Sequence, residues 1–183
     1  ALYVGQLYGI DNVIGTDVGG TSFDVAIVTE GAIAINREPV CERLVLGVPM
    51  LEVDSIGAGG GTLARIDPLT GRLVVGPQSA GAVPGPVCYD KGGEIPTVTD
   101  ADVVLGYLDP DYFLGGRIRL NKDKAAKAIQ ERIAGPLGLD LHRAAMGIKK
   151  LIDLKMRDKV VGMAMSRGLD IGEYCVMGFG GAG

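Results

Sequence analysis

Histidine and cysteine are scarce in this chain. Its 183 residues include one histidine, His142, and three cysteines, Cys41, Cys88 and Cys175. No C-x-x-C pair occurs, and a single histidine cannot complete a set of zinc ligands. The composition therefore excludes a zinc site. Three widely spaced cysteines favour a reduced, cytoplasmic compartment over a disulfide framework.

Basic residues are not in excess, and long apolar runs are absent. Lys and Arg total 18 against 22 Asp and Glu, which gives a formal net charge of −4. A nucleic-acid-binding surface needs a basic patch, and a membrane-spanning helix needs about 20 consecutive apolar residues. We therefore expect neither a nucleic acid nor a membrane as a partner. Hydrophobic residues still make up 47% of the chain, which excludes an intrinsically disordered protein.

Glycine, by contrast, is abundant. The 30 glycines amount to about twice the average share. They gather in short segments at residues 15–20, 57–61, 76–93 and 178–183. Because glycine lets the backbone approach a ligand closely, the position of each segment carries information.

The hydrophobic pattern predicts a mixed α/β fold that forms one unit over residues 1–183. We expect strands at residues 12–17, 22–29, 32–35, 62–66, 72–75, 117–120 and 174–179. Residues 42–54 predict a strand and a short crossing segment, and residues 76–96 a long loop. Helices are expected over 1–7, over 100–107 with Thr99 or Asp100 as cap, over 122–134 with Asn121 as cap, and over 139–167.

The segment GTDVGGTSFD at residues 15–24 carries the clearest functional signal. Asp17 ends a predicted strand, Gly19 and Gly20 make a turn, and the hydroxyls of Thr21 and Ser22 follow. The amides of this turn can bind phosphate oxygens. Asp17 repels phosphate, so it would act through Mg²⁺ or a metal-bound water. The alternative is a tight hairpin turn with a capping aspartate.

Two further glycine segments leave alternatives open. The segment IGAGGGT at residues 56–62 predicts either a close approach to a nucleotide or substrate or a bulge or loop crossing a neighbouring helix; the glycines concerned are Gly57, Gly59, Gly60 and Gly61. Gly178, Gly180 and Gly183 fit G-x-G-x-x-G, but a dinucleotide site needs this pattern in the first βα turn. We therefore interpret residues 178–183 as a strand-to-helix turn that faces a nucleotide.

Four other polar residues have weaker functional signals. Asp100 and Asp102 are either acids at a helix start or ligands of a substrate or metal. Cys88 has no nearby base in the sequence, and His142 stands near a helix start, so we expect both to be structural.

Together, five segments resemble the hydantoinase A/oxoprolinase family. They are NVIGTDVGGTSFDV (12–25), SIGAGGGT (55–62), GPQSAGAVPGPVCY (76–89), PTVTDAD (96–102) and GFGGAG (178–183). Their order and spacing also fit, so the resemblance covers essentially the whole chain.

The resemblance implies the actin-like (ribonuclease H-like) ATPase fold, in which two lobes clasp ATP. Residues 1–183 would form the second lobe, with the first lobe and the C-terminal end missing, and we expect this piece alone to be inactive. By the same resemblance, Asp17 and Thr21 are catalytic, and Asp17 holds Mg²⁺ through water. The implied nucleotide contacts are Gly19, Gly20, Thr21, Ser22, Gly178, Gly180 and Gly181.

The resemblance also implies an activity. Family members use ATP to hydrolyse hydantoins or 5-oxoproline, or to carboxylate ketones such as acetone and acetophenone. ATP and Mg²⁺ are the expected cofactors, and a hydantoinase B-type companion subunit is the expected partner. Two alternatives are a nucleotide-binding or assembly module without turnover and a sugar-kinase-like phosphotransferase. Segments 57–62 and 76–96 match this family in particular and so argue against the phosphotransferase.

Overall fold

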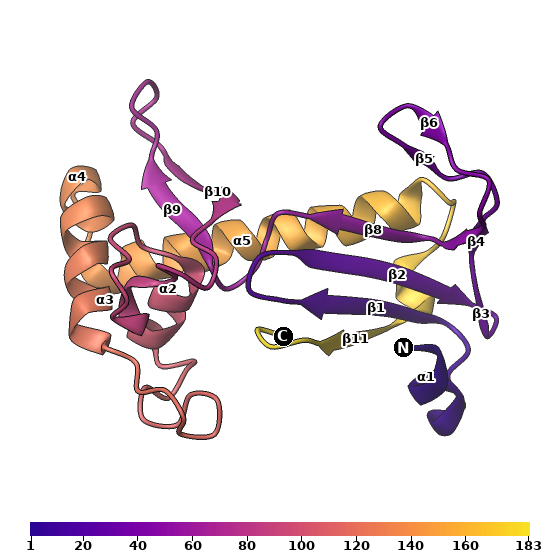
Figure 1. The fold of residues 1–183 in the computed structure, drawn as a ribbon, viewed down its shortest axis with the longest axis horizontal. Helices are drawn as coiled ribbons and strands as arrows, with labels where there is room; N and C mark the ends of the chain where they lie inside the picture. The colour runs from indigo at the N-terminus through magenta and orange to yellow at the C-terminus, as the bar shows by residue number, and fades with distance from the viewer.

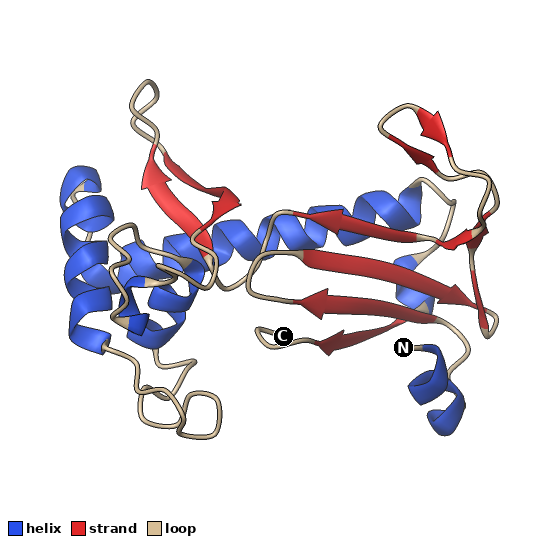
Figure 2. Ribbon diagram, in the orientation of Figure 1, coloured by secondary structure: helices blue, strands red, loops and turns tan.

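The computed structural model describes residues 1–183 as two parts joined by one long helix, α5 (Leu141–Met165) (Figure 1). One part is a five-stranded sheet, and the other holds a strand pair and several shorter helices. Figure 2 shows α5 running behind the sheet and continuing into the helical part. The mixed α/β class predicted from the hydrophobic pattern is thereby confirmed.

The sheet combines antiparallel and parallel pairing. Its order is β11-β1-β2-β3, and β8 also pairs with β2; the bounds are β1 (Val13–Val18), β2 (Phe23–Thr29), β3 (Ala32–Ile33), β8 (Val53–Ile56) and β11 (Cys175–Phe179). β1 and β2 form an antiparallel hairpin, and β11 lies parallel to β1. The carboxyl ends of β1 and β11 therefore meet at one end of the sheet, which faces the helical part (Figure 1).

An arm of the chain, residues 34–52, leaves the sheet between β3 and β8. It contains β4 (Ile35–Asn36), β5 (Val40–Cys41), β6 (Leu44–Val45) and β7 (Met50–Leu51). β4 pairs with β7, β5 pairs with β6, and the Glu52 amide donates to the Ala34 carbonyl at 2.9 Å. The prediction of a strand and a crossing segment over 42–54 was wrong. Pro39 and Pro49 interrupt the ladder, so the apolar run folds back on itself in solvent.

The helical part begins with the antiparallel pair β9 (Thr62–Ile66) and β10 (Leu73–Ser79). The helices and helical turns that follow are η1 (Val87–Tyr89), α2 (Val98–Leu105), α3 (Lys122–Ile129), the π-helical η2 (Gln130–Ala134) and α4 (Gly135–Leu137). Two short elements belong to the sheet part, α1 (Leu2–Tyr8) and the turn η3 (Ile171–Glu173) before β11.

Helix caps show how the sequence sets the element boundaries. Asn121 caps α3 as predicted, because its side chain accepts from the Lys124 amide at 3.1 Å. The predicted caps of α2 were wrong. Thr97 is the cap, and Thr97 and Asp100 form a reciprocal capping box that starts the helix two residues earlier. The strand predicted over 117–120 is also absent; only an isolated bridge joins Phe113 and Ile118.

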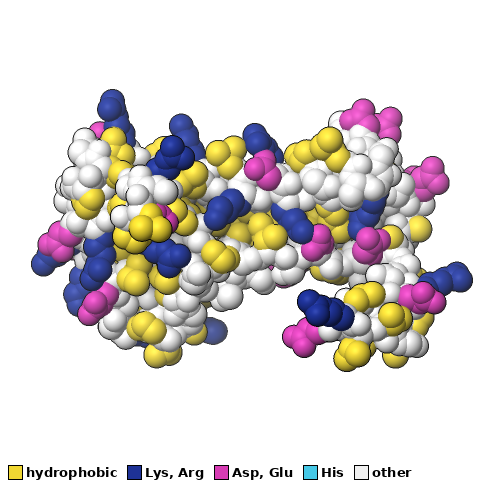
Figure 3. Space-filling view, turned by 90° about the horizontal axis from the view of Figure 1, so that it is seen from above, with side chains coloured by type: hydrophobic (Ala, Val, Ile, Leu, Met, Phe, Trp, Pro, Cys, Tyr) yellow, Lys and Arg dark blue, Asp and Glu magenta, His cyan; other side chains and the backbone are white.

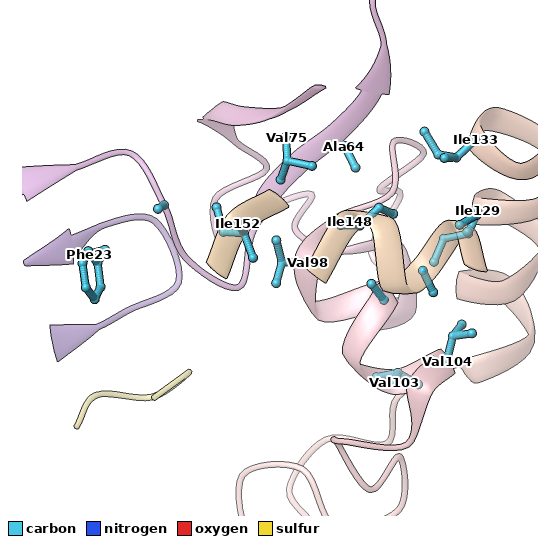
Figure 4. Close-up of a cluster of buried hydrophobic side chains, with 14 of the residues drawn as sticks. Phe23, Ala64, Val75, Val98, Val103, Val104, Ile129, Ile133, Ile148 and Ile152 are labelled. Carbon is cyan, nitrogen blue, oxygen red and sulfur yellow. The ribbon is translucent and has the colours of Figure 1, made fainter. Parts of the chain in front are cut away.

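The hydrophobic core runs along α5, from Ile14, Phe23, Val25 and Ile27 of the sheet into the helical part. Figure 4 shows Ile148 and Ile152 of α5 in one cluster with Val75 of β10 and Val98 of α2. Both isoleucines are fully buried, and burial of each contributes about 1.5–3 kcal/mol. Because α5 also covers the sheet, it fixes the two parts relative to each other.

The surface carries both charge signs. On the face shown in Figure 3, Lys and Arg side chains lie along the long axis of the molecule, interspersed with Asp and Glu. None of the helices combines the length and hydropathy that crossing a membrane requires.

Candidate functional site

Three glycine segments that are far apart in the sequence meet where the sheet faces the helical part. The turn 19–22 follows β1, the loop 57–61 follows β8, and the segment 180–183 follows β11. The Gly60 amide donates to the Gly19 carbonyl at 3.1 Å, and the Ala182 amide donates to the Val18 carbonyl at 2.9 Å. The fold therefore assembles the segments that the sequence marked separately.

The turn 19–22 presents free backbone donors. Its one internal hydrogen bond runs from the Gly19 amide to the Ser22 carbonyl at 2.9 Å. The amides of Gly20, Thr21 and Ser22 donate no hydrogen bond within the chain. Gly20 and Thr21 are exposed. Backbone amides without a partner inside the chain are the donors that anion-binding turns use.

Two carboxylates lie beside this turn. Asp17 of β1 and Asp24 of β2 are directly opposite each other in the antiparallel ladder, so their side chains share one face of the sheet. Both residues are half-buried, and the Ser22 hydroxyl donates to Asp24 Oδ2 at 3.0 Å. Carboxylate oxygens are the ligands that Mg²⁺ prefers. The residues present therefore fit a Mg²⁺ ion held by Asp17, directly or through water.

Asp24 is a polar residue of the site that the sequence analysis did not select. A signal for it exists in the sequence. In a hairpin centred on the turn 19–22, the residue opposite Asp17 on the second strand is residue 24. Extending the predicted hairpin by its register would have placed the two carboxylates together.

The loop 57–61 lies behind the turn. Gly59, Gly60 and Gly61 are buried, and the Gly61 amide donates to the Gly20 carbonyl at 2.7 Å. A Cβ on Gly59 would lie 2.9 Å from the Thr21 amide nitrogen, and one on Gly61 would lie 2.9 Å from the Gly20 carbonyl oxygen. Only glycine allows this contact between two backbones. The structure thus gives these three glycines a supporting position behind the turn, whereas Gly57 is exposed.

The amino end of α2 holds the loop 57–61 in turn. The backbone amide and the hydroxyl of Thr99 both donate to the Gly60 carbonyl at 2.8 Å. The free donors of a helix start are therefore used to fix a loop. The Thr97 capping box fixes where α2 starts and so sets the direction of the two Thr99 donors.

Asp100 is a buried structural carboxylate. It is fully inaccessible, and it accepts from the amides of Val87, Cys88 and Thr97 at 3.2, 2.7 and 2.8 Å and from the Thr97 hydroxyl at 2.8 Å. It ties the Gly/Pro-rich segment 76–96 to α2. With both oxygens bonded and buried, Asp100 has no open side toward a substrate or metal. The substrate or metal role that the sequence left open for it is corrected to this structural one.

Asp102 faces α5 rather than the glycine segments. Its Oδ1 is buried and has no hydrogen-bond partner. Burial raises the pKa of Asp102 to about 6; nearby Lys149 opposes this shift and Asp153 adds to it. Cys88 is buried beside Asp100, and burial raises its thiol pKa far above the ordinary value. A thiol held protonated is a poor nucleophile.

The segment after β11 closes on β1. Gly178 lies opposite Thr16 in the parallel ladder. Gly180 has a φ of 99°, and a Cβ there would lie 2.7 Å from the Val18 amide nitrogen. Gly181 is exposed with open space around its Cα. Gly180 thus combines a left-handed backbone conformation with a contact too close for a side chain, and only glycine satisfies both.

A second residue that the sequence analysis missed is Ser79, at the end of β10. Its hydroxyl is 3.2 Å from the Thr21 hydroxyl. No local pattern marks Ser79, because the contact joins residues 58 positions apart and depends on how the two parts are packed.

Known proteins resemble this chain over almost its whole length. The chain is 48% identical over 182 residues to the acetophenone carboxylase gamma subunit of Aromatoleum aromaticum, covering 99% of this chain and 25% of that subunit. It is 49% identical over 181 residues to the caprolactamase subunit alpha of Pseudomonas jessenii, covering 99% of this chain and 26% of that subunit.

A solved structure gives the same result. The nucleotide-free structure of acetone carboxylase, described with the mechanism of ATP-dependent acetone carboxylation, superposes with a TM-score of 0.90 at 40% identity, over 98% of this chain and 25% of that one. The chain spans about a quarter of the length of these relatives. A family model described as hydantoinase/oxoprolinase matches residues 1–183. The resemblance drawn from the glycine segments is confirmed, and the chain belongs to the hydantoinase/oxoprolinase family.

Proposed function

We propose that residues 1–183 form the second lobe of an actin-like ATPase and bind the phosphates of ATP in an enzyme of this family. The observation that carries the proposal is the set of three free amides at Gly20, Thr21 and Ser22, beside the paired carboxylates of Asp17 and Asp24. Anion donors and cation ligands side by side suit a nucleotide triphosphate with its metal.

In this proposal the turn 19–22 holds the terminal phosphates. Its amides and the hydroxyls of Thr21 and Ser22 donate to phosphate oxygens. Asp17 holds Mg²⁺, most simply through water. When bound, Mg²⁺ would neutralise the charge on the phosphate oxygens. Gly178, Gly180 and Gly181 lie on the adenosine side, where Gly180 packs against β1 and the open space around Gly181 leaves room for the nucleoside.

The reaction we propose is phosphorylation of an amide or enol oxygen. That oxygen attacks the γ-phosphorus of ATP, the bond from this phosphorus to the β–γ bridging oxygen breaks, and ADP leaves. The product carries a good leaving group, which allows hydrolysis of a cyclic amide or carboxylation of a ketone. Catalysis by this lobe would consist of positioning and charge neutralisation. A caprolactamase subunit and a carboxylase subunit both stand among the relatives, which supports either substrate class.

Other protein components complete the proposed site. Relatives are named as subunits and are about four times longer than this chain. We propose that a first lobe closes over the nucleotide and that a hydantoinase B-type companion subunit carries out the second chemical step. Residues 1–183 alone would then bind nucleotide weakly and not turn over.

The test is ADP release by the full-length enzyme with its companion subunit. Hydantoin, 5-oxoproline and ketones, the ketones with bicarbonate, are offered in turn with Mg-ATP. We expect one of them to stimulate ADP release and Asp17→Ala to abolish this stimulation without lowering the unfolding temperature. Asp158→Ala, which removes an exposed carboxylate on α5, is the matched control. Wild-type turnover by Asp17→Ala would refute the phosphate site.

A further inference from the structure

The hydroxyl of Ser79 reaches the phosphate turn because of a bulge in β10. From Leu73 to Val75, β10 pairs with β9 in constant register, and Val75 lies opposite Ala64. Continued without a break, that register would place Pro77 opposite Thr62. The observed partner of Thr62 is Ser79. Two additional residues in β10 thus bring Ser79 to the end of the ladder, beside the turn 19–22. Bulges of this kind re-aim side chains and are common next to active sites.

Several contacts fix the position of the Ser79 hydroxyl. The Gly81 amide donates to Ser79 Oγ at 3.1 Å, and the Ala80 amide donates to the Gly61 carbonyl at 2.8 Å. Gly61 is itself bonded to Gly20. A Cβ on Gly61 would lie 3.0 Å from Ser79 Oγ, so the hydroxyl sits tightly against this loop. The chain therefore holds Ser79 Oγ in place relative to the turn.

Either hydroxyl can donate in the contact between Ser79 and Thr21, and the other partner of Ser79 favours Ser79 as the donor. Each hydroxyl has one proton and two acceptor lone pairs. Ser79 Oγ already accepts from Gly81, and its own proton has one partner within reach, Thr21 Oγ1 at 3.2 Å. Thr21 is exposed, so its proton can go to a ligand. If Thr21 donated to Ser79 instead, the turn would lose a donor on its open side.

We propose that Ser79 is a positioning residue that donates to Thr21 and thereby aims the Thr21 proton at a phosphate oxygen of the nucleotide. This inference rests on the proposed function of the turn 19–22. It makes β10 part of the phosphate site, although β10 belongs to the helical part of the molecule. Ser79 does not touch the reacting atoms and acts only through Thr21.

A double-mutant cycle on the full-length enzyme tests this role, with kcat and KM for Mg-ATP and the affinity for a fluorescent ATP analogue as readouts. Loss of one oriented hydrogen bond predicts that Ser79→Ala lowers kcat/KM for ATP about five- to tenfold. In a Thr21→Val background the same substitution should have less than about a twofold effect, since its target is gone. Ser79→Thr, which keeps a hydroxyl, should restore most of the activity.

The possible outcomes separate the two proposals. Equal effects of Ser79→Ala in both backgrounds, or no rescue by Ser79→Thr, would overturn the role of Ser79 and leave the phosphate site intact. No binding of the analogue to the wild-type enzyme would overturn the proposed function and the role of Ser79 with it. If Ser79→Ala lowers the unfolding temperature, the comparison of Ser79→Thr with Thr21→Val still separates the two proposals, because Ser79→Thr keeps the hydroxyl and Thr21→Val keeps the shape of the side chain.

Discussion

Asp17 and Asp24 stand directly opposite each other on neighbouring antiparallel strands, next to the turn that joins them. Like charges in this position repel and destabilise a sheet. The chain offers one compensating contact, from the Ser22 hydroxyl to Asp24. A cation between the two carboxylates would remove the repulsion. In the proposed function, Mg²⁺ held by Asp17 would supply this cation.

The first prediction concerns this repulsion. Asp24→Asn keeps an oxygen that can accept from Ser22 but removes one negative charge. We expect the enzyme without metal to gain about 0.2–1 kcal/mol at low salt. The stabilisation that Mg-ATP gives the wild type should become smaller in the variant. Thermal unfolding at low and high salt, with and without Mg-ATP, measures both effects. Asp158→Asn is the control, and an identical response of the two variants would contradict the pairing.

The second prediction concerns the contact between two glycine segments. A methyl group at position 61 would meet the Gly20 carbonyl oxygen at 2.9 Å. We expect Gly61→Ala to destabilise the protein by about 1–3 kcal/mol and to speed hydrogen exchange at the amides that are bonded across this contact, those of Gly19, Gly60 and residue 61. Gly162→Ala in α5, where no atom lies within 4 Å of the added Cβ, is the matched control and should stabilise by about 0.5–1 kcal/mol. A neutral Gly61→Ala would show that the loop does not support the turn.

Local signals in the sequence predicted much of the fold. The alternation in β2, the Asn121 cap and the periodicity of α5 each depend on neighbours a few residues apart, so a single sequence contains them. The arm over residues 34–52 was missed because its apolar residues are exposed; Val40 and Leu44 are 65% and 69% accessible. A hydrophobic run is normally interpreted as buried, and nothing local distinguishes this one.

In the candidate site, too, the local features were predicted from the sequence and the long-range contacts were not. The turn 19–22 and Asp17 were predicted because glycines, an acid and hydroxyls stand together in the sequence. The burial of Gly59 to Gly61 and of Asp100 was not predicted, because it results from packing between segments that are distant in the sequence, such as Thr99 and Gly60, which are 39 positions apart. Ser79 depends on a bulge and on the packing of two parts of the molecule. Sequence patterns predict that a segment is functional, but they do not show which of its residues are exposed and which are buried.

The third prediction concerns Asp100. Asp100→Asn replaces one acceptor oxygen by an amino group that faces backbone donors. We expect a loss of about 1–3 kcal/mol, with faster hydrogen exchange at Val87, Cys88 and Thr97. Asp158→Asn should change neither. Unaltered exchange over residues 85–97 in Asp100→Asn would mean that this carboxylate does not hold the Gly/Pro-rich segment.

The fourth prediction concerns Asp102 and pH. Burial raises its pKa from 3.8 to about 6 in the folded protein. Unfolding therefore releases a proton between these two values, and this contribution to stability, complete below pH 3.8, is lost as the pH rises through 6. Asp102→Asn stays neutral at every pH. Relative to the wild type, we expect it to gain about 1–3 kcal/mol at pH 8 and progressively less as the pH falls toward 4.

Thermal unfolding of the wild type and Asp102→Asn over pH 4–8 measures this difference. Lys149 and Asp153, the charged residues of α5 that act on Asp102, are present in both proteins, so the comparison isolates the side chain at position 102. Asp123→Asn on the exposed side of α3 is the control and should show no such pH dependence. A gain from Asp102→Asn that stayed constant from pH 4 to 8 would show that Asp102 titrates alike in the folded and unfolded chains. Its buried Oδ1 would then have to be hydrated or paired in solution.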